Sequence, residues 1–194
     1  MKKKKITGLF FGSFNPIHIG HMAIANYLVE YGKLDEIWFV VSPHNPLKEK
    51  KSLLNGHHRL MMVKEAIEGD TRFRARDIEF KMPQPSYTID TLTFLTEQNP
   101  EKNFCLIVGS DSIASFKKWK NFETILSDYS ILVYPRPGDE ESEFLKHPNV
   151  KLVEAPRMDV SSSFIRKAIA DKKDVRHFVS ERVWKYMEEM GFYK

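Results

Sequence analysis

The stretch GLFFGSFNPIHIGH, residues 8–21, decides the fold of this chain because three local patterns follow one another within it. The apolar run 5–11 has the composition of a strand that is buried on both faces of a sheet. Turn-forming residues come next, and apolar residues then recur at helical spacing over 21–32. The stretch therefore predicts a strand, a turn and a helix, with His18 and His21 where the helix begins.

The rest of the chain repeats this alternation of strand and helix. Further strands are predicted at 36–42, 73–80, 103–109, 129–135 and 150–155, and further helices at 56–69, 88–98 and 180–192. The helix over 21–32 places Ala23, Tyr27 and Tyr31 on one stripe, with Ile24 and Leu28 alongside. The order predicts an α/β fold, with a doubly wound, Rossmann-like, mostly parallel sheet and helices on both faces. We expect residues 1–194 to form a single domain, with a basic tail at 1–5 and a helical segment at 172–194.

The composition excludes several classes of protein. A hydrophobic fraction of 42% and a charged fraction of 29% are ordinary for a globular protein, and no apolar run approaches the roughly 20 residues that cross a bilayer. The net charge of +4 equals the charge of the lysines at 2–5, so we expect a solvated tail and no nucleic-acid partner. The single cysteine, Cys105, is expected to pack in the core. A single cysteine and the lack of a recognisable secretory signal together predict a cytoplasmic protein.

The turn and helix start after the first strand are the strongest candidate for a ligand site. In doubly wound sheets, ligands bind beyond the carboxyl ends of the strands, near the point where the strand order reverses. The free N–H groups of a first helical turn favour a phosphate, and Gly20 would allow a close backbone approach. His18 and His21 lie on one helix face and could donate to one phosphate chain. A metal site and a packing or capping role are the alternatives.

Two motifs carry a family resemblance. GSFNPIHIGH resembles the signature of the nucleotidyltransferase superfamily with the HxGH motif, whose members transfer a nucleoside monophosphate from a nucleoside triphosphate. VSSSFIR, residues 160–166, resembles that family's ISSTxIR motif, with Val160 in place of Ile and Ser163 in place of Thr. The resemblance implies that His18, His21 and Arg166 are catalytic, and that residues 1–194 form a nucleotidyltransferase domain. It implies that ATP is bound by Gly12, Ser13, Phe14, Asn15, His18, Gly20, His21, Ser161, Ser162, Ser163 and Arg166.

The second motif also has a physical interpretation. Serines at 161–163 are strong N-cap residues for the helix that follows. Arg166 lies one helical turn further on, so hydroxyl groups, a helix start and a guanidinium could converge on phosphate oxygens. A serine cap beside an unrelated surface arginine is the alternative for this motif taken alone.

The acceptor of the transferred group is indicated by other segments. SYTIDTL, residues 86–92, closely resembles the stretch that marks bacterial nicotinate-mononucleotide adenylyltransferases, which make deamido-NAD from ATP and nicotinate mononucleotide. There Ser86 and Thr88 would offer hydroxyls and backbone donors at a helix start. In this family a GxD element follows a central strand, and a tryptophan beyond it lies against the nicotinate ring. The resemblance implies a nicotinate-mononucleotide site made of Ser86, Tyr87, Thr88, Gly109, Asp111 and Trp119, with His44 and Lys48 as weaker members.

One segment departs from the family pattern. The compact PHK-type element after the second strand is replaced by SPHNPLKEK, residues 42–50. His44 is kept, but the basic residue is displaced to Lys48 by the inserted NPL. The long loops predicted at 43–55 and 135–148 are excursions from the one domain, and loops of that length are more often functional than idle.

The implied reaction is an in-line attack by the phosphate of nicotinate mononucleotide on the α-phosphorus of ATP, with Mg²⁺ as cofactor and pyrophosphate leaving. The nearest alternative is an adenylyltransferase for nicotinamide mononucleotide or phosphopantetheine, and SYTIDTL and Trp119 argue against phosphopantetheine. A catalytically inactive nucleotide-binding regulatory module is opposed by the intact His18, His21 and Arg166, and an RNA-binding protein would rest on the lysine tail alone. The sequence predicts neither a metal held by the protein nor a membrane partner, and leaves a homo-oligomer open.

Overall fold

Six strands form one sheet in the part of the chain that the structure describes. The computed structural model describes residues 4–43, 53–136 and 142–194. The strands are β1 Lys5–Gly12, β2 Glu36–Val41, β3 Phe73–Arg76, β4 Lys102–Gly109, β5 Ser130–Tyr134 and β6 Val150–Leu152. They lie in the order β3-β2-β1-β4-β5-β6, and each neighbouring pair is parallel. The predicted α/β fold with a doubly wound sheet is confirmed.

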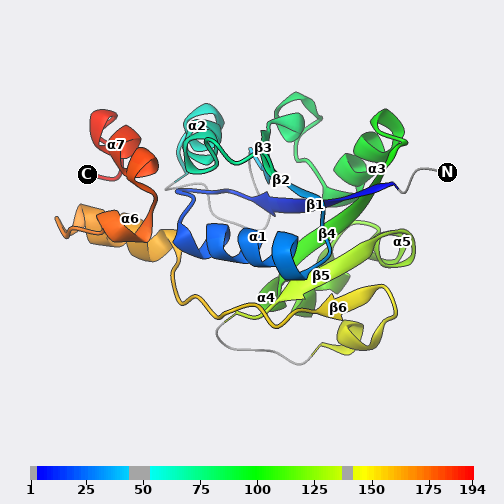
Figure 1. Cartoon of the computed structure of the whole chain (residues 1–194). Coiled ribbons are helices and arrows are strands. Elements are labelled where there is room, and N and C mark those ends of the chain that lie inside the picture. The colour runs from blue at the N-terminus through cyan, green and yellow to red at the C-terminus, as the bar shows by residue number, and fades with distance from the viewer. Residues whose placement is uncertain (1–3, 44–52, 137–141) are drawn as a thin grey trace.

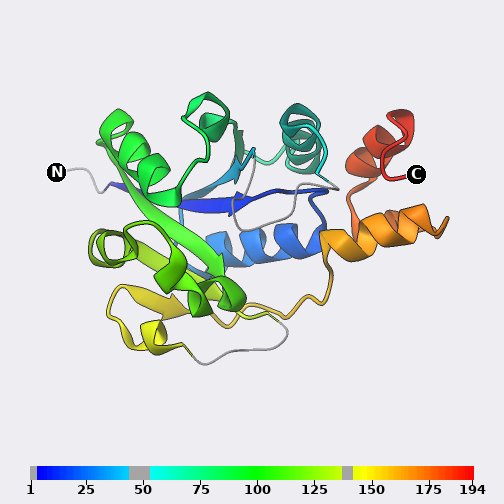
Figure 2. The same cartoon turned by 180° about the vertical axis from the view of Figure 1, so that it is seen from behind.

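Helices cover both faces of the sheet (Figures 1 and 2). The α-helices are α1 Ile19–Tyr31, α2 Gly56–Ala66, α3 Thr88–Gln98, α4 Ser110–Ala114, α5 Phe122–Asp128, α6 Ser162–Ala170 and α7 Glu181–Glu189. Short 3₁₀ turns are η1 Ile78–Lys81, η2 Phe116–Lys118, η3 Glu143–Lys146 and η4 Arg176–Phe178. One apolar core joins the sheet to α1, α2, α6 and α7, and a second joins its other face to α3, α4 and α5. Successive residues such as Leu9 and Phe10 enter opposite cores, which explains the nearly continuous apolar strands.

The strand order reverses between β1 and β4, in the middle of the sheet. From β1 the chain builds outward through β2 and β3, and after α3 it returns to the centre and builds the other way. β1 ends at Gly12 and the neighbouring β4 ends at Gly109. The carboxyl ends of these two strands therefore mark the switch point, where a doubly wound sheet binds its ligands.

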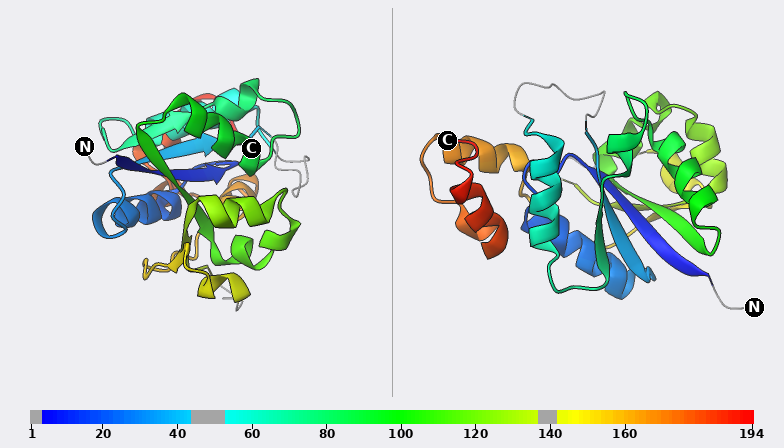
Figure 3. Two further views of the ribbon diagram at one scale, coloured as in Figure 1. Left: turned by 90° about the vertical axis from the view of Figure 1, so that its right-hand side faces the viewer. Right: turned by 90° about the horizontal axis from the view of Figure 1, so that it is seen from above.

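The C-terminal helices lie at this same end of the molecule. In Figures 1 and 2, α6 lies beyond the end of α1 at which that helix begins, and Figure 3 shows α7 alongside α2. The contact between α7 and α2 includes a hydrogen bond of 2.9 Å between the Tyr186 hydroxyl and Nδ1 of His58. Residues after the last strand thus return to the end of the sheet at which β1 ends.

Several predicted elements end earlier than expected. The run 73–80 forms a strand only to Arg76, because the chain then winds into the turn η1 and buries the carboxylate of Glu79, which is 3% exposed. β6 stops at Leu152, α2 at Ala66 and α7 at Glu189, each short of its predicted limit. No helix within the described ranges is long and apolar enough to span a membrane.

The buried stripe of α1 differs from the predicted one. Ile24, Ala25 and Leu28 are buried, whereas Tyr31 is 71% exposed. Tyr31 instead lies against the ring of Tyr27, one helical turn away, at a centroid distance of 4.9 Å. Ile24 and Leu28, which were expected beside the stripe, therefore face the sheet. In β4, Cys105 is buried as predicted.

Candidate active site

A cavity of about 490 Å³ opens at the carboxyl ends of β1 and β4. Its lining includes Gly12, Ser13, Phe14, Asn15, His18, His21, Ser86, Tyr87, Thr88, Gly109, Asp111, Trp119, Ser161, Ser162, Ser163 and Arg166. These are the predicted site residues from four segments of the sequence, brought together at the switch point, and Gly20 is the predicted residue of the described ranges that is absent from the lining. His44 and Lys48 lie outside the described residues.

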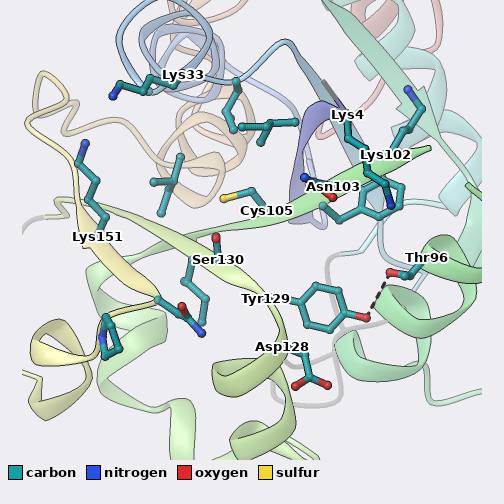
Figure 4. Close-up of a pocket in the computed structure, with 18 of the residues that line it drawn as sticks. Lys4, Lys33, Thr96, Lys102, Asn103, Cys105, Asp128, Tyr129, Ser130 and Lys151 are labelled. Atoms are coloured by element: carbon teal, nitrogen blue, oxygen red, sulfur yellow. Dashed lines mark hydrogen bonds between the residues drawn. The ribbon is translucent and has the colours of Figure 1, made fainter. Parts of the chain in front are cut away.

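A second cavity, of about 620 Å³, opens at the opposite end of the strands (Figure 4). It lies around the amino ends of the central strands, and the lysines in its lining are Lys4, Lys33, Lys102 and Lys151. Lys102 is already engaged, because its ammonium group lies 2.6 Å from a carboxylate oxygen of Glu36. None of the predicted site residues within the described ranges lines this cavity. The cavity at the carboxyl ends is therefore the candidate active site.

The turn after β1 presents two imidazole rings at the start of α1. The His18 and His21 rings lie against each other at a centroid distance of 3.8 Å, and the His18 backbone N–H donates to Nδ1 of His21 at 3.2 Å. Because Nδ1 accepts this bond, neutral His21 carries its proton on Nε2, which is then a donor. Phe10 and Phe14 pack edge-on against the His21 ring at centroid distances of 6.0 and 5.1 Å and fix its orientation.

His18 is held neutral by its surroundings. The residue is 4% exposed, and burial together with the nearby Arg136 guanidinium lowers the pKa of His18 to about 4. Its Nδ1 atom finds no hydrogen-bond partner among the described residues. A Cβ at Gly20 would lie 3.1 Å from Cε1 and Nδ1 of His18. Gly20 therefore makes room for this ring, whereas the sequence predicted a close backbone approach.

The start of α6 is bonded directly to the turn after β1. The Ser162 hydroxyl donates to the carbonyl of Pro16 at 2.8 Å, and Nη1 of Arg166 donates to the carbonyl of Asn15 at 2.8 Å. The Ser161 hydroxyl caps α6 by accepting a backbone N–H bond, as predicted for this serine cluster. Two motifs from opposite ends of the chain thus meet, with two helix starts and one guanidinium facing one cavity.

The start of α3 forms another wall of the cavity. Tyr87 is the N-cap residue, and its side chain makes no capping bond within the described residues. The Ser86 hydroxyl, which the sequence suggested as a donor to a ligand, donates instead to Glu79 at 3.1 Å and is buried. The groups that this helix start offers to the cavity are therefore backbone N–H groups and the side chains of Tyr87 and Thr88.

Glu79 is a buried carboxylate in the lining that sequence reasoning missed. It accepts hydrogen bonds from the hydroxyls of Ser86 and Thr91, at 3.1 and 3.0 Å, and from that of Ser42. Burial outweighs these bonds and raises the pKa of Glu79. Glu79 thus ties the end of β2 to the start of α3. No local pattern marks it, because a glutamate between two apolar residues is ordinary in a half-exposed strand.

Gly109, Asp111 and Trp119 line the same side, as the GxD resemblance implied. A Cβ at Gly109 would lie 2.4 Å from Oδ1 of Asp111 and 3.0 Å from Cγ of Arg136, so a side chain does not fit there. The Asp111 side chain is 59% exposed and lies 3.8 Å from Nε of Arg136. The Trp119 ring packs against Phe116 at a centroid distance of 5.2 Å. This wall therefore offers one carboxylate and one aromatic ring to a ligand.

Arg59 holds the loops beneath the cavity together. Its side chain is fully buried and donates to the carbonyls of Leu54 at 2.9 Å, Ser13 at 2.6 Å, Ser42 at 2.7 Å and Pro43 at 2.9 Å. Burial lowers the pKa of Arg59 to about 10, so the guanidinium stays charged at neutral pH. Within the predicted helix 56–69 this arginine gave no sequence signal, because arginine is common on exposed helix faces. It joins the segments that follow β1 and β2.

Comparisons with known proteins show which family and fold the chain shares. The family model described as cytidylyltransferase-like matches residues 9–168. The chain is 52% identical over 190 residues to a protein of Christiangramia forsetii named "Probable nicotinate-nucleotide adenylyltransferase", covering 97% of this chain and 98% of that one. A protein of Bacteroides thetaiotaomicron with the same name is 50% identical over 183 residues, covering 94% of this chain and 91% of that one. A solved structure of Plasmodium falciparum nicotinic acid mononucleotide adenylyltransferase, complexed with NaAD, shares the fold with a TM-score of 0.82 at 22% identity, covering 97% of each chain.

Proposed function

The chain belongs to the cytidylyltransferase-like family and, within it, to the nicotinate-nucleotide adenylyltransferases, and on that premise we propose that it transfers AMP from ATP to nicotinate mononucleotide. The observation that carries the proposal is the meeting of three helix starts, those of α1, α3 and α6, around one cavity. Each helix start favours an anion, and the reaction brings together a triphosphate and a second nucleotide that carries a phosphate and a carboxylate.

The starts of α1 and α6 form the ATP side of the cavity in this proposal. His18, neutral because it is buried, contributes a hydrogen bond rather than a charge. His21, with its proton on Nε2, donates to the phosphate where negative charge develops in the transition state. Arg166 contributes the permanent charge and holds the pyrophosphate end. The backbone of Gly12 to Asn15 and the serines at 161–163 complete this side.

The start of α3 and the wall of β4 form the acceptor side. Backbone N–H groups after Tyr87 suit the carboxylate of a nicotinate ring, since they offer donors without a counter-charge. Trp119 offers a flat face for the electron-poor pyridine ring, and Asp111 offers acceptors for ribose hydroxyls. The proposal leaves Ser86 a positioning contact with Glu79.

The chemistry needs positioning and charge neutralisation, with no covalent nucleophile. A phosphate oxygen of nicotinate mononucleotide forms a bond to the α-phosphorus of ATP, and the bond from that phosphorus to the β-phosphate oxygen breaks. Deamido-NAD and pyrophosphate are the products. We propose that Mg²⁺ enters bound to ATP, because triphosphate oxygens are ligands that it prefers, and that it neutralises charge there.

Acceptor specificity tests the proposal. The protein is incubated with ATP and Mg²⁺ plus nicotinate mononucleotide, nicotinamide mononucleotide or phosphopantetheine, and pyrophosphate and the adenylylated product are measured. We expect strong preference for nicotinate mononucleotide. Equal or better use of nicotinamide mononucleotide would move the assignment to that acceptor. ATP binding without turnover of any acceptor would indicate a nucleotide-binding regulatory module.

A further inference from the structure

The last residues of the chain return to the ATP side of the cavity. After α7, Gly191 and Tyr193 both have positive φ, at 64° and 66°, and they reverse the direction of the chain. Tyrosine seldom adopts this conformation, so surrounding contacts must hold the turn. One such contact is the Phe192 ring, which lies edge-on to His58 of α2 at a centroid distance of 4.9 Å. The turn carries Tyr193 to the loop that follows β1.

The Tyr193 hydroxyl reaches a residue of the predicted phosphate loop. It donates to Oδ1 of Asn15 at 2.8 Å, and the same oxygen lies 3.4 Å from the backbone N–H of Leu54. The backbone carbonyl of Asn15 accepts from Nη1 of Arg166 at 2.8 Å. Asn15 is 4% exposed, so both bonds are shielded from water. One asparagine thus connects the C-terminal tyrosine to the guanidinium that faces the triphosphate side.

The protonation state of the Tyr193 hydroxyl suits a hydrogen-bond donor. Burial raises the pKa of Tyr193, although the Arg166 and Arg59 guanidinium groups nearby oppose the shift. The hydroxyl therefore stays protonated at physiological pH and keeps donating to Asn15. Tyr193 is absent from the lining of the cavity, whereas Asn15 and Arg166 belong to it. The hydrogen bonds from Tyr193 to Asn15 and from Arg166 to Asn15 thus link its hydroxyl to the lining.

We propose that Tyr193 is a positioning residue for ATP: its hydroxyl fixes the side chain of Asn15 and, through the Asn15 backbone, the guanidinium of Arg166. The inference rests on the proposed function in taking ATP as the ligand of this side. It makes the end of the 172–194 segment, which carries no family motif, part of the donor site.

The test is the Tyr193→Phe variant of the full chain, with binding of Mg²⁺-ATP measured by calorimetry. This variant keeps the ring and its packing and removes one hydrogen bond. We expect the Kd for ATP to rise about fivefold, with an unchanged KM for nicotinate mononucleotide. The loss of one buried hydrogen bond should lower the midpoint of thermal unfolding by at most about 4 °C. Tyr186→Phe is the matched control, because it removes another hydrogen bond of a C-terminal tyrosine, the one between Tyr186 and His58 of α2, and neither residue lines the cavity. It should leave the Kd for ATP unchanged.

A second measurement separates positioning from general stability. In an Arg166→Ala background, Tyr193→Phe should change the Kd for ATP less than it does in the native chain, because the coupled group is gone. Equal effects in both backgrounds, or an unchanged Kd in Tyr193→Phe, would overturn the inference. Because ATP binding is measured without an acceptor, a chain that binds ATP through Tyr193 and transfers nothing would refute the proposed function alone. A native chain that does not bind ATP would refute both.

Discussion

The two sides of the cavity use charge in opposite ways. On the ATP side, the charged and polar side chains themselves line the cavity: His18, His21 and Arg166 project from the starts of α1 and α6. On the acceptor side, the carboxylate of Glu79 is buried behind the start of α3, and the hydroxyl of Ser86 is turned toward it. The first side offers imidazoles and a guanidinium to an anion. The second offers backbone N–H groups at a helix start that Glu79 holds in place, together with the ring of Trp119 and the exposed carboxylate of Asp111.

This difference fits the ligand that we propose for each side. A triphosphate carries several negative charges, so donors and a guanidinium aimed at it stabilise both the ligand and the charge that develops during transfer. A nicotinate ring carries one carboxylate on a flat apolar body, for which uncapped N–H groups and an aromatic face suffice. The three hydroxyls bonded to Glu79 then fix where those N–H groups lie.

The largest expected effect comes from the ATP side. His21→Ala removes the imidazole donor at the start of α1, and we expect turnover to fall by about 10²–10³, the usual loss for one preorganised donor. Steady-state assays with ATP and nicotinate mononucleotide measure the fall, and the unfolding midpoint checks the fold. His57→Ala is the matched control, since His57 is an exposed histidine near the start of α2 and outside the cavity lining. Turnover near the native value in His21→Ala would remove the contrast between the two sides.

The pH dependence of stability tests whether water is excluded from His18 on the ATP side. The pKa of His18 is lowered from 6.5 to about 4. Between pH 4 and pH 6.5, His18 is therefore protonated in the unfolded chain and neutral in the folded chain. Stability from this residue is complete above pH 6.5 and is lost as pH falls toward 4. Urea unfolding at pH 7 and pH 5 should show about 2 kcal/mol more loss in the native protein than in His18→Gln. Equal losses would mean that water reaches this imidazole.

The sequence predicts the ATP side better than the acceptor side, for a physical reason. His18, His21 and Arg166 lie near helix starts, where spacing along the chain determines which side chains share a face. The sheet and its reversal follow from apolar runs that alternate with helical periods. These are local patterns. They lead to the right fold, whereas the family resemblance of the two motifs implied that they share a site; the structure joins them by a bond between Pro16 and Ser162, 146 residues apart.

Long-range contacts explain what the sequence does not predict. Glu79 lies in a run predicted as a strand, and its inward turn depends on Ser42, Ser86 and Thr91, which come from other segments. Arg59 is a similar case, because the four carbonyls it satisfies belong to two separate loops, one after β1 and one between β2 and α2. Buried charges of this kind are recognised only when their partners are known, since the residue type alone predicts exposure.

The smallest expected effect tests the acceptor side by an isosteric change. Glu79→Gln keeps the shape of the side chain and removes the charge that the hydroxyls of Ser42, Ser86 and Thr91 hold. Losing about 1 kcal/mol of hydrogen bonding should raise the KM for nicotinate mononucleotide about fivefold, with an unchanged KM for ATP. Because burial raises the pKa of Glu79, its charged form is costly at neutral pH, so the variant should be as stable as the native protein or more stable.

Glu36 supplies the matched control for this last change, because it is a buried glutamate at the other edge of the sheet. Although burial opposes the shift, hydrogen bonds from Lys102 and Thr7 lower the pKa of Glu36 to about 2, so its charge stabilises the fold above that range. Glu36→Gln should therefore lower the free energy of unfolding at pH 7 and leave both KM values unchanged. Suppose that the free energy of unfolding falls in Glu36→Gln and rises in Glu79→Gln, and that the KM for nicotinate mononucleotide changes in Glu79→Gln alone. This result would show that the charge of Glu79 serves the acceptor site. If Glu79→Gln instead lost stability as Glu36→Gln does, the carboxylate would be a structural ion and would not serve the acceptor side.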